Sequence, residues 1–177
     1  MLVLLLLVPG GSACDNRTGV VDRPGPFPDA GSKGEVTTER NLDPVIPGIY
    51  GAVLVARLEE QGLTCSPGGR ELYPVYYDCL QSTPTEKYRV HLYCDDANHV
   101  QVIKAYASSD TPETTAHRAG AFLAFAASMP FEGKKAATAE KWVLDHIMTD
   151  TAQVIEGMLF TLGGDERARN LRIAPAQ

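Results

Sequence analysis

Apolar side chains recur every three or four positions in residues 49–62, IYGAVLVARLEEQG, which is the spacing of an amphipathic helix. Glu59 and Glu60 fall on the polar side, and Gly62 is typical of the position that ends a helix. The apolar face consists of Ile49, Val53, Leu54 and Leu58. We therefore predict a helix that ends at Gly62.

Two further helices are expected later in the chain. Asp110-Thr-Pro-Glu113 combines a capping residue, an early proline and a glutamate three places on, as helix starts do. The apolar positions that follow continue to about Ser128, and Pro130 marks the end. A shorter helix is predicted over 139–148, with Trp142, Val143 and Ile147 on one side.

Three segments between these helices alternate apolar and polar residues, and turn formers separate them. The expected strands are 71–80, 87–94 and 99–107. The C-terminal region predicts a closing hairpin, with 153–162 as one strand and 168–174 as the other. The order α-β-β-β-α-α-β-β predicts a two-layer α+β domain, in which an antiparallel sheet packs on about three helices.

The first two predicted strands can be aligned from their residues if the loop is 82–85. This register places Tyr77 opposite Val90 and Asp78 opposite Arg89, so one face is apolar and the other carries a charge pair. The third strand cannot be assigned a face in this way, because Gln101 and Lys104 fall on opposite sides.

The polar face of this pair gathers residue types that are enriched where proteins bind partners. Its members are Tyr76, Arg89, His91 and Tyr93. We expect these four side chains to stand together in solvent as a candidate binding face. The alternatives are an ordinary solvated face and a face covered by the second pair of helices.

The only long apolar run is Leu2 to Val8, too short for a bilayer-spanning helix of about 20 residues but long enough for a signal-peptide core. After it, Gly11-Ser12-Ala13-Cys14 loosely resembles the lipobox of bacterial lipoproteins. That resemblance implies a signal peptide over 1–13 and a lipid on the Cys14 thiol. The alternatives are a plain secretory signal and a remnant of an expression linker, since LVPGGS differs by one residue from a thrombin linker.

Residues 15–45 contain four prolines and four glycines with almost no apolar periodicity, a composition typical of a flexible spacer. We therefore expect a tether over 14–45 and one globular domain over 46–177. The expected location is the cell envelope, anchored to the membrane on its extracytoplasmic side, and the alternative is a secreted protein.

The composition bounds the partners. A chain of 177 residues with 44% hydrophobic residues suffices for one ordinary domain. The formal charge of −6 includes no basic block, which argues against nucleic acid as a partner. The expected partners are the membrane, through the lipid, and a protein of the envelope.

Three cysteines remain in the domain once Cys14 is assigned to lipid, so at most one pair can form. The register places Cys94 near the start of the first strand, close to the helix end that precedes Cys65. A Cys65–Cys94 bridge is therefore expected, because bridged Cα atoms lie within about 7 Å. A pair that involves Cys79, or no bridge, is the alternative. Cys79 itself is expected to be a buried small residue rather than a nucleophile.

The sequence offers no strong sign of metal, cofactor or catalytic chemistry. No two of the four histidines have the i, i+4 spacing that aims both at one metal, and Asp95–Asn98 is too short for a calcium loop. The glycine pairs do not join a strand to a helix as phosphate loops require. We expect a non-catalytic binding or structural domain. The alternative is an exported enzyme of the hydrolase class, whose site residues are distant in sequence.

Overall fold

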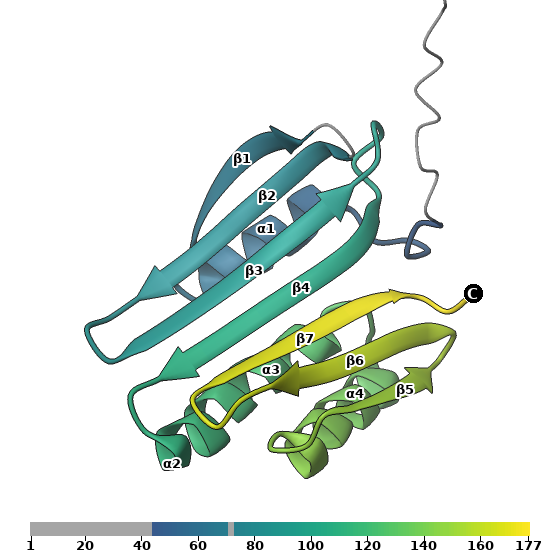
Figure 1. Ribbon diagram of the computed structural model, residues 1–177. Coiled ribbons are helices and arrows are strands. Elements are labelled where there is room, and N and C mark those ends of the chain that lie inside the picture. Colours follow the sequence, from purple (N-terminus) through teal and green to yellow (C-terminus); the bar gives the residue numbers. More distant parts are fainter. Residues whose placement is uncertain (1–43, 71–72) are drawn as a thin grey trace, which may run out of the picture. The chain divides into compact units, whose positions relative to one another are not determined.

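A computed structural model describes residues 44–70 and 73–177 (Figure 1). The strands are β1 (Thr64–Arg70), β2 (Tyr73–Ser82), β3 (Glu86–Cys94), β4 (Val100–Ser109), β5 (Thr151–Ile155), β6 (Met158–Gly164) and β7 (Ala168–Pro175). The helices are α1 (Gly51–Glu60), α2 (Pro112–Thr114), α3 (Gly120–Ser128) and α4 (Gly133–His146), with a π-helical segment, η1 (Thr115–Ala119), between α2 and α3. The expected signal peptide, Cys14 and nearly all of the expected tether lie outside the described residues.

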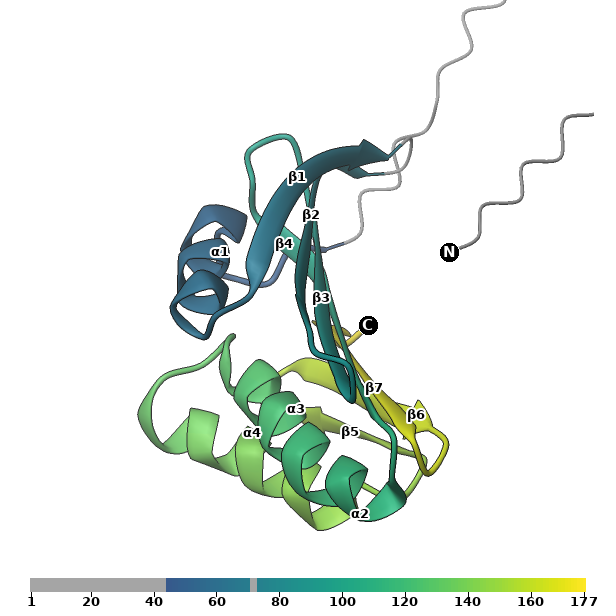
Figure 2. The same ribbon diagram turned by 90° about the vertical axis from the view of Figure 1, so that its left-hand side faces the viewer.

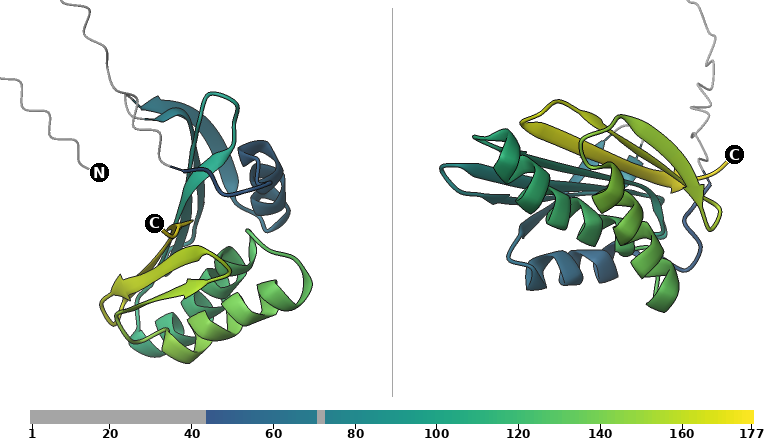
Figure 3. Two further views of the ribbon diagram at one scale, coloured as in Figure 1. Left: turned by 90° about the vertical axis from the view of Figure 1, so that its right-hand side faces the viewer. Right: turned by 90° about the horizontal axis from the view of Figure 1, so that it is seen from below.

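All seven strands form one antiparallel sheet in the order β1-β2-β3-β4-β7-β6-β5. The helices lie on one face of this sheet, with α1 over the β1–β3 half and the α3–α4 pair over the other half (Figures 2 and 3). The main core lies between the two layers and includes Leu58, Leu92, Ile103, Leu123 and Phe160, all fully buried. The predicted two-layer α+β fold is confirmed.

The three predicted helices are present, with differences in detail. In α1, Leu54 and Leu58 are buried as expected, but Val53 is 57% exposed. The second helix begins with Thr111 as its capping residue, whose hydroxyl accepts a hydrogen bond from the Thr114 N–H. The third begins earlier than predicted, at Gly133.

Two strands were not predicted. The segment of β1, TCSPGGR, contains proline and two glycines, residues that interior strands usually avoid. This strand pairs with β2 at the edge of the sheet, where a missing ladder hydrogen bond is tolerated. The sequence predicts a single strand over 153–162, where the structure has β5 and β6. Glu156 and Gly157 separate them in a two-residue turn with φ angles of 52° and 80°, the left-handed conformation of tight hairpins.

The predicted register of β2 and β3 is wrong by two residues. Tyr77 lies opposite Leu92, and Asp78 lies opposite His91. The hairpin turn is tighter than expected, because the Thr83 N–H donates to the Glu86 carbonyl and the Thr83 hydroxyl accepts from the Glu86 N–H. A shift of two residues leaves every side chain on its predicted face, since side chains alternate with a period of two.

The ambiguous face of β4 has a local cause. Tyr93 lies opposite Val102, but Cys94 lies opposite Val100, so Gln101 is the extra residue of a β-bulge. The bulge lets Val100 and Ile103 both face the core despite their spacing of three. Lys104 then lies on the face without helices.

The expected Cys65–Cys94 bridge is wrong. Cys65 is bonded to Cys79, its direct neighbour across β1 and β2, and Cys94 is a buried free cysteine. The prediction failed because it treated Cys65 as part of a loop after the helix, whereas β1 carries it back along β2. Cys79 is buried, as expected, but it is half of the disulfide.

The start of the described chain is attached to the middle of the sheet. The Ile46 N–H donates to the Val100 carbonyl, and the Val100 N–H donates to the Ile49 carbonyl. Tyr50 forms an isolated antiparallel bridge with His99, and the Gly51 N–H donates to the Asn98 carbonyl. Ile46 is also buried in the main core. The chain therefore enters the fold beside β4, the central strand.

Candidate functional site

The sheet face opposite the helices, here called the outer face, carries the residues that the sequence singled out. Tyr76 comes from β2, and Arg89, His91 and Tyr93 come from alternate positions of β3. No described helix covers this face (Figure 2). The sequence therefore predicted correctly which side chains share the face.

The expected exposure of the two tyrosines is wrong. Tyr76 and Tyr93 are only 7% and 6% exposed, and they form a second hydrophobic cluster with Val102 and Ala174. Tyr73 packs against them, with its ring centroid 4.7 Å from that of Tyr93. Burial arises because β4 and β7 bring apolar side chains beside β3 on the same face. These tyrosines are a small core of their own rather than a contact surface.

Arg89 and Asp78 form a two-pronged ion pair beside this cluster. The Arg89 guanidinium donates from Nε and Nη2 to the two carboxylate oxygens of Asp78, at 2.7 and 2.5 Å. This hydrogen-bonded pair raises the pKa of Arg89, although partial burial opposes the effect. His91 Nε2 lies 3.4 Å from the same carboxylate. The charge pair predicted from sequence is present, but as diagonal neighbours.

A hollow of about 370 Å³ lies next to this ion pair on the outer face. Its side chains include Arg89, His91, Lys104, Tyr106, Asn170 and Arg172. Three of them stand in one row across the sheet, because His91 lies opposite Lys104 and Lys104 lies opposite Arg172. The Lys104 ammonium is also 5.0 Å from the ring centroid of Tyr93, a cation–π distance. The hollow is open, and the charged side chains that line it include the cations Arg89, Lys104 and Arg172.

A second hollow of about 350 Å³ adjoins the first and shares Arg172. Its apolar lining includes Val102, Val154, Leu159 and Ala174, and Val154 is 55% exposed. Strands β6 and β5 supply Leu159 and Val154, so this hollow extends toward the sheet edge. The lining of the second hollow is mixed, since Gln101 and Gln177 also border it. The two hollows together place the apolar side chains of β5 and β6 next to the cationic row.

A separate polar group lies at the turn between β3 and β4. The Asp95 carboxylate accepts hydrogen bonds from the His99 backbone N–H at 2.8 Å and lies 3.0 Å from the His99 ring nitrogen. Burial alone raises the pKa of Asp95, but its hydrogen bonds with His99 outweigh this effect and lower it. The neighbouring thiol of Cys94 is fully buried, which raises its pKa to about 12. A thiol that stays protonated is a poor nucleophile, so this group has the properties of a structural turn.

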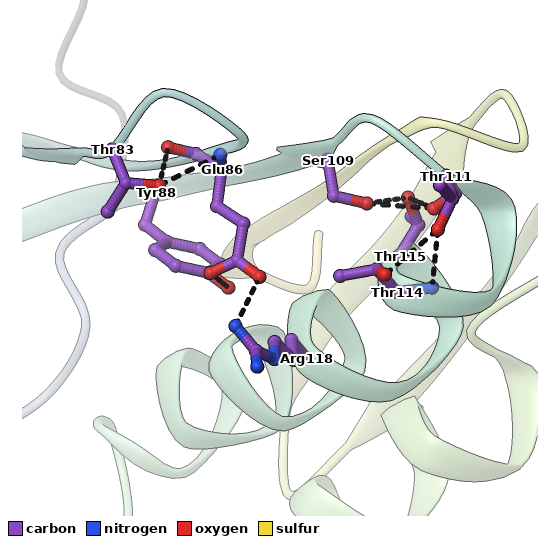
Figure 4. Close-up of polar contacts among 8 residues, drawn as sticks. All are labelled: Thr83, Glu86, Tyr88, Ser109, Thr111, Thr114, Thr115 and Arg118. Atoms are coloured by element: carbon purple, nitrogen blue, oxygen red, sulfur yellow. Dashed lines mark hydrogen bonds and ion pairs between the residues drawn. The ribbon is translucent and has the colours of Figure 1, made fainter.

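Figure 4 shows a third polar group, at the opposite end of the sheet. Glu86 accepts hydrogen bonds from the Tyr88 hydroxyl at 3.1 Å and from Arg118 Nη1 at 2.7 Å, which links the β2–β3 hairpin to η1 (Figure 4). Burial and the hydrogen bond with Glu86 raise the pKa of Tyr88 to about 12. These contacts connect the hairpin to the helical layer.

The hydroxyl groups in the same view fix the start of the second helix. The oxygens of Ser109 and Thr115 lie 2.6 Å apart, and both hydroxyls are within hydrogen-bond distance of the Thr111 carbonyl (Figure 4). Thr115 is fully buried. Among the residues that the structure describes, these hydroxyls bond to other hydroxyls and to backbone groups, not to a basic side chain that would activate them as nucleophiles. The cluster therefore accounts for local structure.

The described residues contain no group of three His, Cys, Asp or Glu side chains placed to hold a metal ion. Within the same part of the chain, no helix has the length and hydrophobicity needed to cross a membrane. The chain matches no protein-family model, no curated protein and no solved structure.

Sequence reasoning missed the residues that complete the hollows. These residues lie two positions apart on each strand, a spacing that places side chains on one face of a sheet. They are Lys104 and Tyr106 on β4, and Asn170 and Arg172 on β7. That signal could not be used, because the bulge at Gln101 hid the phase of β4 and nothing in the sequence pairs β4 with β7.

Proposed function

We propose that this chain is a lipid-anchored protein of the cell envelope whose domain binds a ligand on the outer face without catalysis. The observation that carries the binding proposal is the pair of adjoining hollows on a sheet face that no described helix covers. Pockets that bind small molecules combine an apolar lining with a few polar groups that fix orientation, and these hollows have both.

The location rests on two independent features. The Gly11-Ser12-Ala13-Cys14 motif follows a short apolar run. The Cys65–Cys79 disulfide supports an oxidising compartment, because disulfides persist mainly outside the cytosol. Both features agree with export to the extracytoplasmic side of a membrane.

Phase partitioning in the native host tests the anchor. The unaltered protein should enter the detergent phase, and Cys14→Ser should move it to the aqueous phase, because the substitution removes the thiol that would carry the lipid. Cys94→Ser is the matched control and should leave the partition unchanged. An unaltered protein that already partitions into water would contradict the anchor.

Native mass spectrometry of the full chain, purified from its host, tests the binding face. A co-purified small molecule is expected, and Asn170→Trp should remove it because a large side chain at this exposed position of β7 fills the cationic hollow. Leu144→Trp is the matched control, since Leu144 is 52% exposed on α4, in the helical layer. A preparation without a bound molecule, or one that Asn170→Trp retains, would contradict the proposal.

A further inference from the structure

Two positive charges face each other on the outer face, and neither has an acidic partner in the described part of the chain. Lys104 on β4 lies directly opposite Arg172 on β7. Within residues 44–70 and 73–177, no carboxylate lies within ion-pair distance of either side chain. The neighbouring cation Arg89 differs, since Asp78 takes up its charge. The pair stands out in a chain whose net charge is −6.

Like charges directly opposite each other destabilise a sheet, and an anion placed between them would relieve the repulsion. The guanidinium of Arg172 can donate two parallel hydrogen bonds to a carboxylate or phosphate, and Lys104 adds a compact positive charge. Asn170 and Tyr106, in the next row of the same face, add hydrogen-bonding groups at the rim. This end of the site fits an anionic head group.

The second hollow, which holds the apolar side chains Val154 and Leu159, adjoins the cationic one, because Arg172 lines both. On β6, Thr161 lies opposite Arg172, and Leu159 lies one row further along the same face, opposite Ala174. Val154 on β5 lies opposite Leu159. Because β7 and β5 are two strand spacings of about 4.8 Å apart, the path extends about 10 Å across the strands. Such a path suits a single aliphatic chain rather than a second polar group.

We propose that the outer face binds a single-chain anionic amphiphile. Its carboxylate or phosphate head lies between Lys104 and Arg172, and its chain lies over Leu159 and Val154. This inference rests on the proposed function, whose ligand class it names. The charge of the two cations selects the head, and the tail is selected by the half-buried Leu159 on β6 and the exposed Val154 on the edge strand β5.

Isothermal titration of the full chain tests this inference, with Cys14→Ser in every sample so that no attached lipid competes. The probes are monododecyl phosphate below its micellar concentration, inorganic phosphate, and dodecyl maltoside, which has the same chain on a neutral head. Monododecyl phosphate should bind at least about tenfold more tightly than either of the others, because it alone uses both hollows.

Variants divide the site into its two parts. Lys104→Gln with Arg172→Gln should weaken binding of monododecyl phosphate at least about tenfold. Val154→Ser with Leu159→Ser should reduce its affinity toward that of inorganic phosphate. Lys87→Gln is the matched control, because Lys87 is an exposed cation on the same face of β3 that does not line the hollows. Its affinity should match that of the parent chain.

Equal binding of dodecyl maltoside would overturn the role of charge, and equal binding of inorganic phosphate would overturn the role of the chain. Absence of binding by monododecyl phosphate would overturn the inference as a whole. If a co-purified molecule is still displaced by Asn170→Trp in that case, the proposed function stands and only the ligand class is wrong. If Asn170→Trp retains the molecule, the proposed function itself fails.

Discussion

Tyr76 and Tyr93 lie directly opposite each other on β2 and β3, with ring centroids 5.2 Å apart, and each side chain is more than nine-tenths buried. Because both side chains are buried, truncating them should destabilise the fold, whereas truncating exposed side chains would have little effect. Tyr76→Ala and Tyr93→Ala should each lower the free energy of unfolding by about 3 kcal/mol, the usual cost of truncating a buried aromatic ring.

Urea denaturation measures this effect, and Tyr106→Ala is its control. Tyr106 lies on the same face but is 37% exposed, so its truncation should change the free energy of unfolding by less than about 1 kcal/mol. If all three variants were equally stable, Tyr76 and Tyr93 would be surface residues and the second cluster would not exist.

The disulfide should stabilise the fold by restricting the unfolded chain. Cys65 and Cys79 are separated by 14 positions, and a loop of this length corresponds to about 3 kcal/mol in the loop-entropy model. Cys65→Ser with Cys79→Ser should lower the free energy of unfolding by this amount. Peptide mapping without reduction should recover Cys65 linked to Cys79, with Cys94 alkylated only after unfolding. A peptide that joins Cys94 to either cysteine would contradict the pairing of β1 with β2.

Stability should fall at high pH because of Tyr88. Its pKa rises from 10.0 to about 12 in the folded chain, chiefly through burial and then through the hydrogen bond to Glu86. Below pH 10 both folded and unfolded forms keep the proton, so the contribution of Tyr88 is intact. Between about pH 10 and 12 the unfolded form loses its proton first, so the contribution is lost as pH rises.

Urea denaturation across this range should therefore show a steeper loss of stability for the parent chain than for Tyr88→Phe, which has no proton to lose. Cys94, whose pKa is also raised to about 12, contributes equally to both chains and cancels in the difference. Parallel slopes for the parent chain and Tyr88→Phe would show that Tyr88 ionises as it does in the unfolded chain.

Arg169 is a buried cation. Removing its ion-pair partner should lower the free energy of unfolding. Its side chain is only 3% exposed, and it donates to the Asp150 carboxylate and to the Thr149 carbonyl, both at 2.9 Å. Asp150→Ala should lower the free energy of unfolding by about 2 kcal/mol, because it leaves a buried charge without its counterion. This cost is smaller than the cost of breaking a fully buried ion pair, because Asp150 is 70% exposed and water screens its charge.

Asp145→Ala is the control for this comparison. Asp145 pairs with Lys141 on the exposed side of α4, where both side chains are at least half exposed. Such pairs contribute about 0.5 kcal/mol or less. Thermal and urea denaturation of both variants should rank Asp150→Ala well below Asp145→Ala in stability, and the reverse order would show that water screens Arg169.

The alternation of side chains along the sequence was sufficient to predict the faces of β2 and β3. It predicted that Tyr76 and Tyr93 share a face with Arg89 and His91, and a register error of two residues did not alter this result. It could not predict that Tyr76 and Tyr93 are buried, because their cover comes from Val102 and Ala174. Those residues belong to β4 and β7, strands that are distant in sequence and adjacent in the sheet.

The unpredicted strand β1 and the wrongly predicted disulfide have one origin. Residues 64–70 contain Pro67 and Gly68, which favour loops, so the chain after α1 was not recognised as a strand. Pairing of that strand with β2 brings Cys65 beside Cys79, which the sequence alone could not show. The cationic pair of Lys104 and Arg172 was hidden for the same physical reason, because it depends on a strand pairing between residues far apart in the chain.

The attachment of Ile46 and Ile49 to Val100 determines how the domain would respond to tension. A pull on the chain before Ile46 acts first on two backbone hydrogen bonds at the central strand, not on a strand at the edge of the sheet. Force spectroscopy should therefore record a weak first rupture as this segment detaches, followed by a larger one as the sheet breaks. A molecule pulled from its N-terminal side would be held at the middle of its fold, and moderate stretching would release residues 46–49 while the seven strands stay paired.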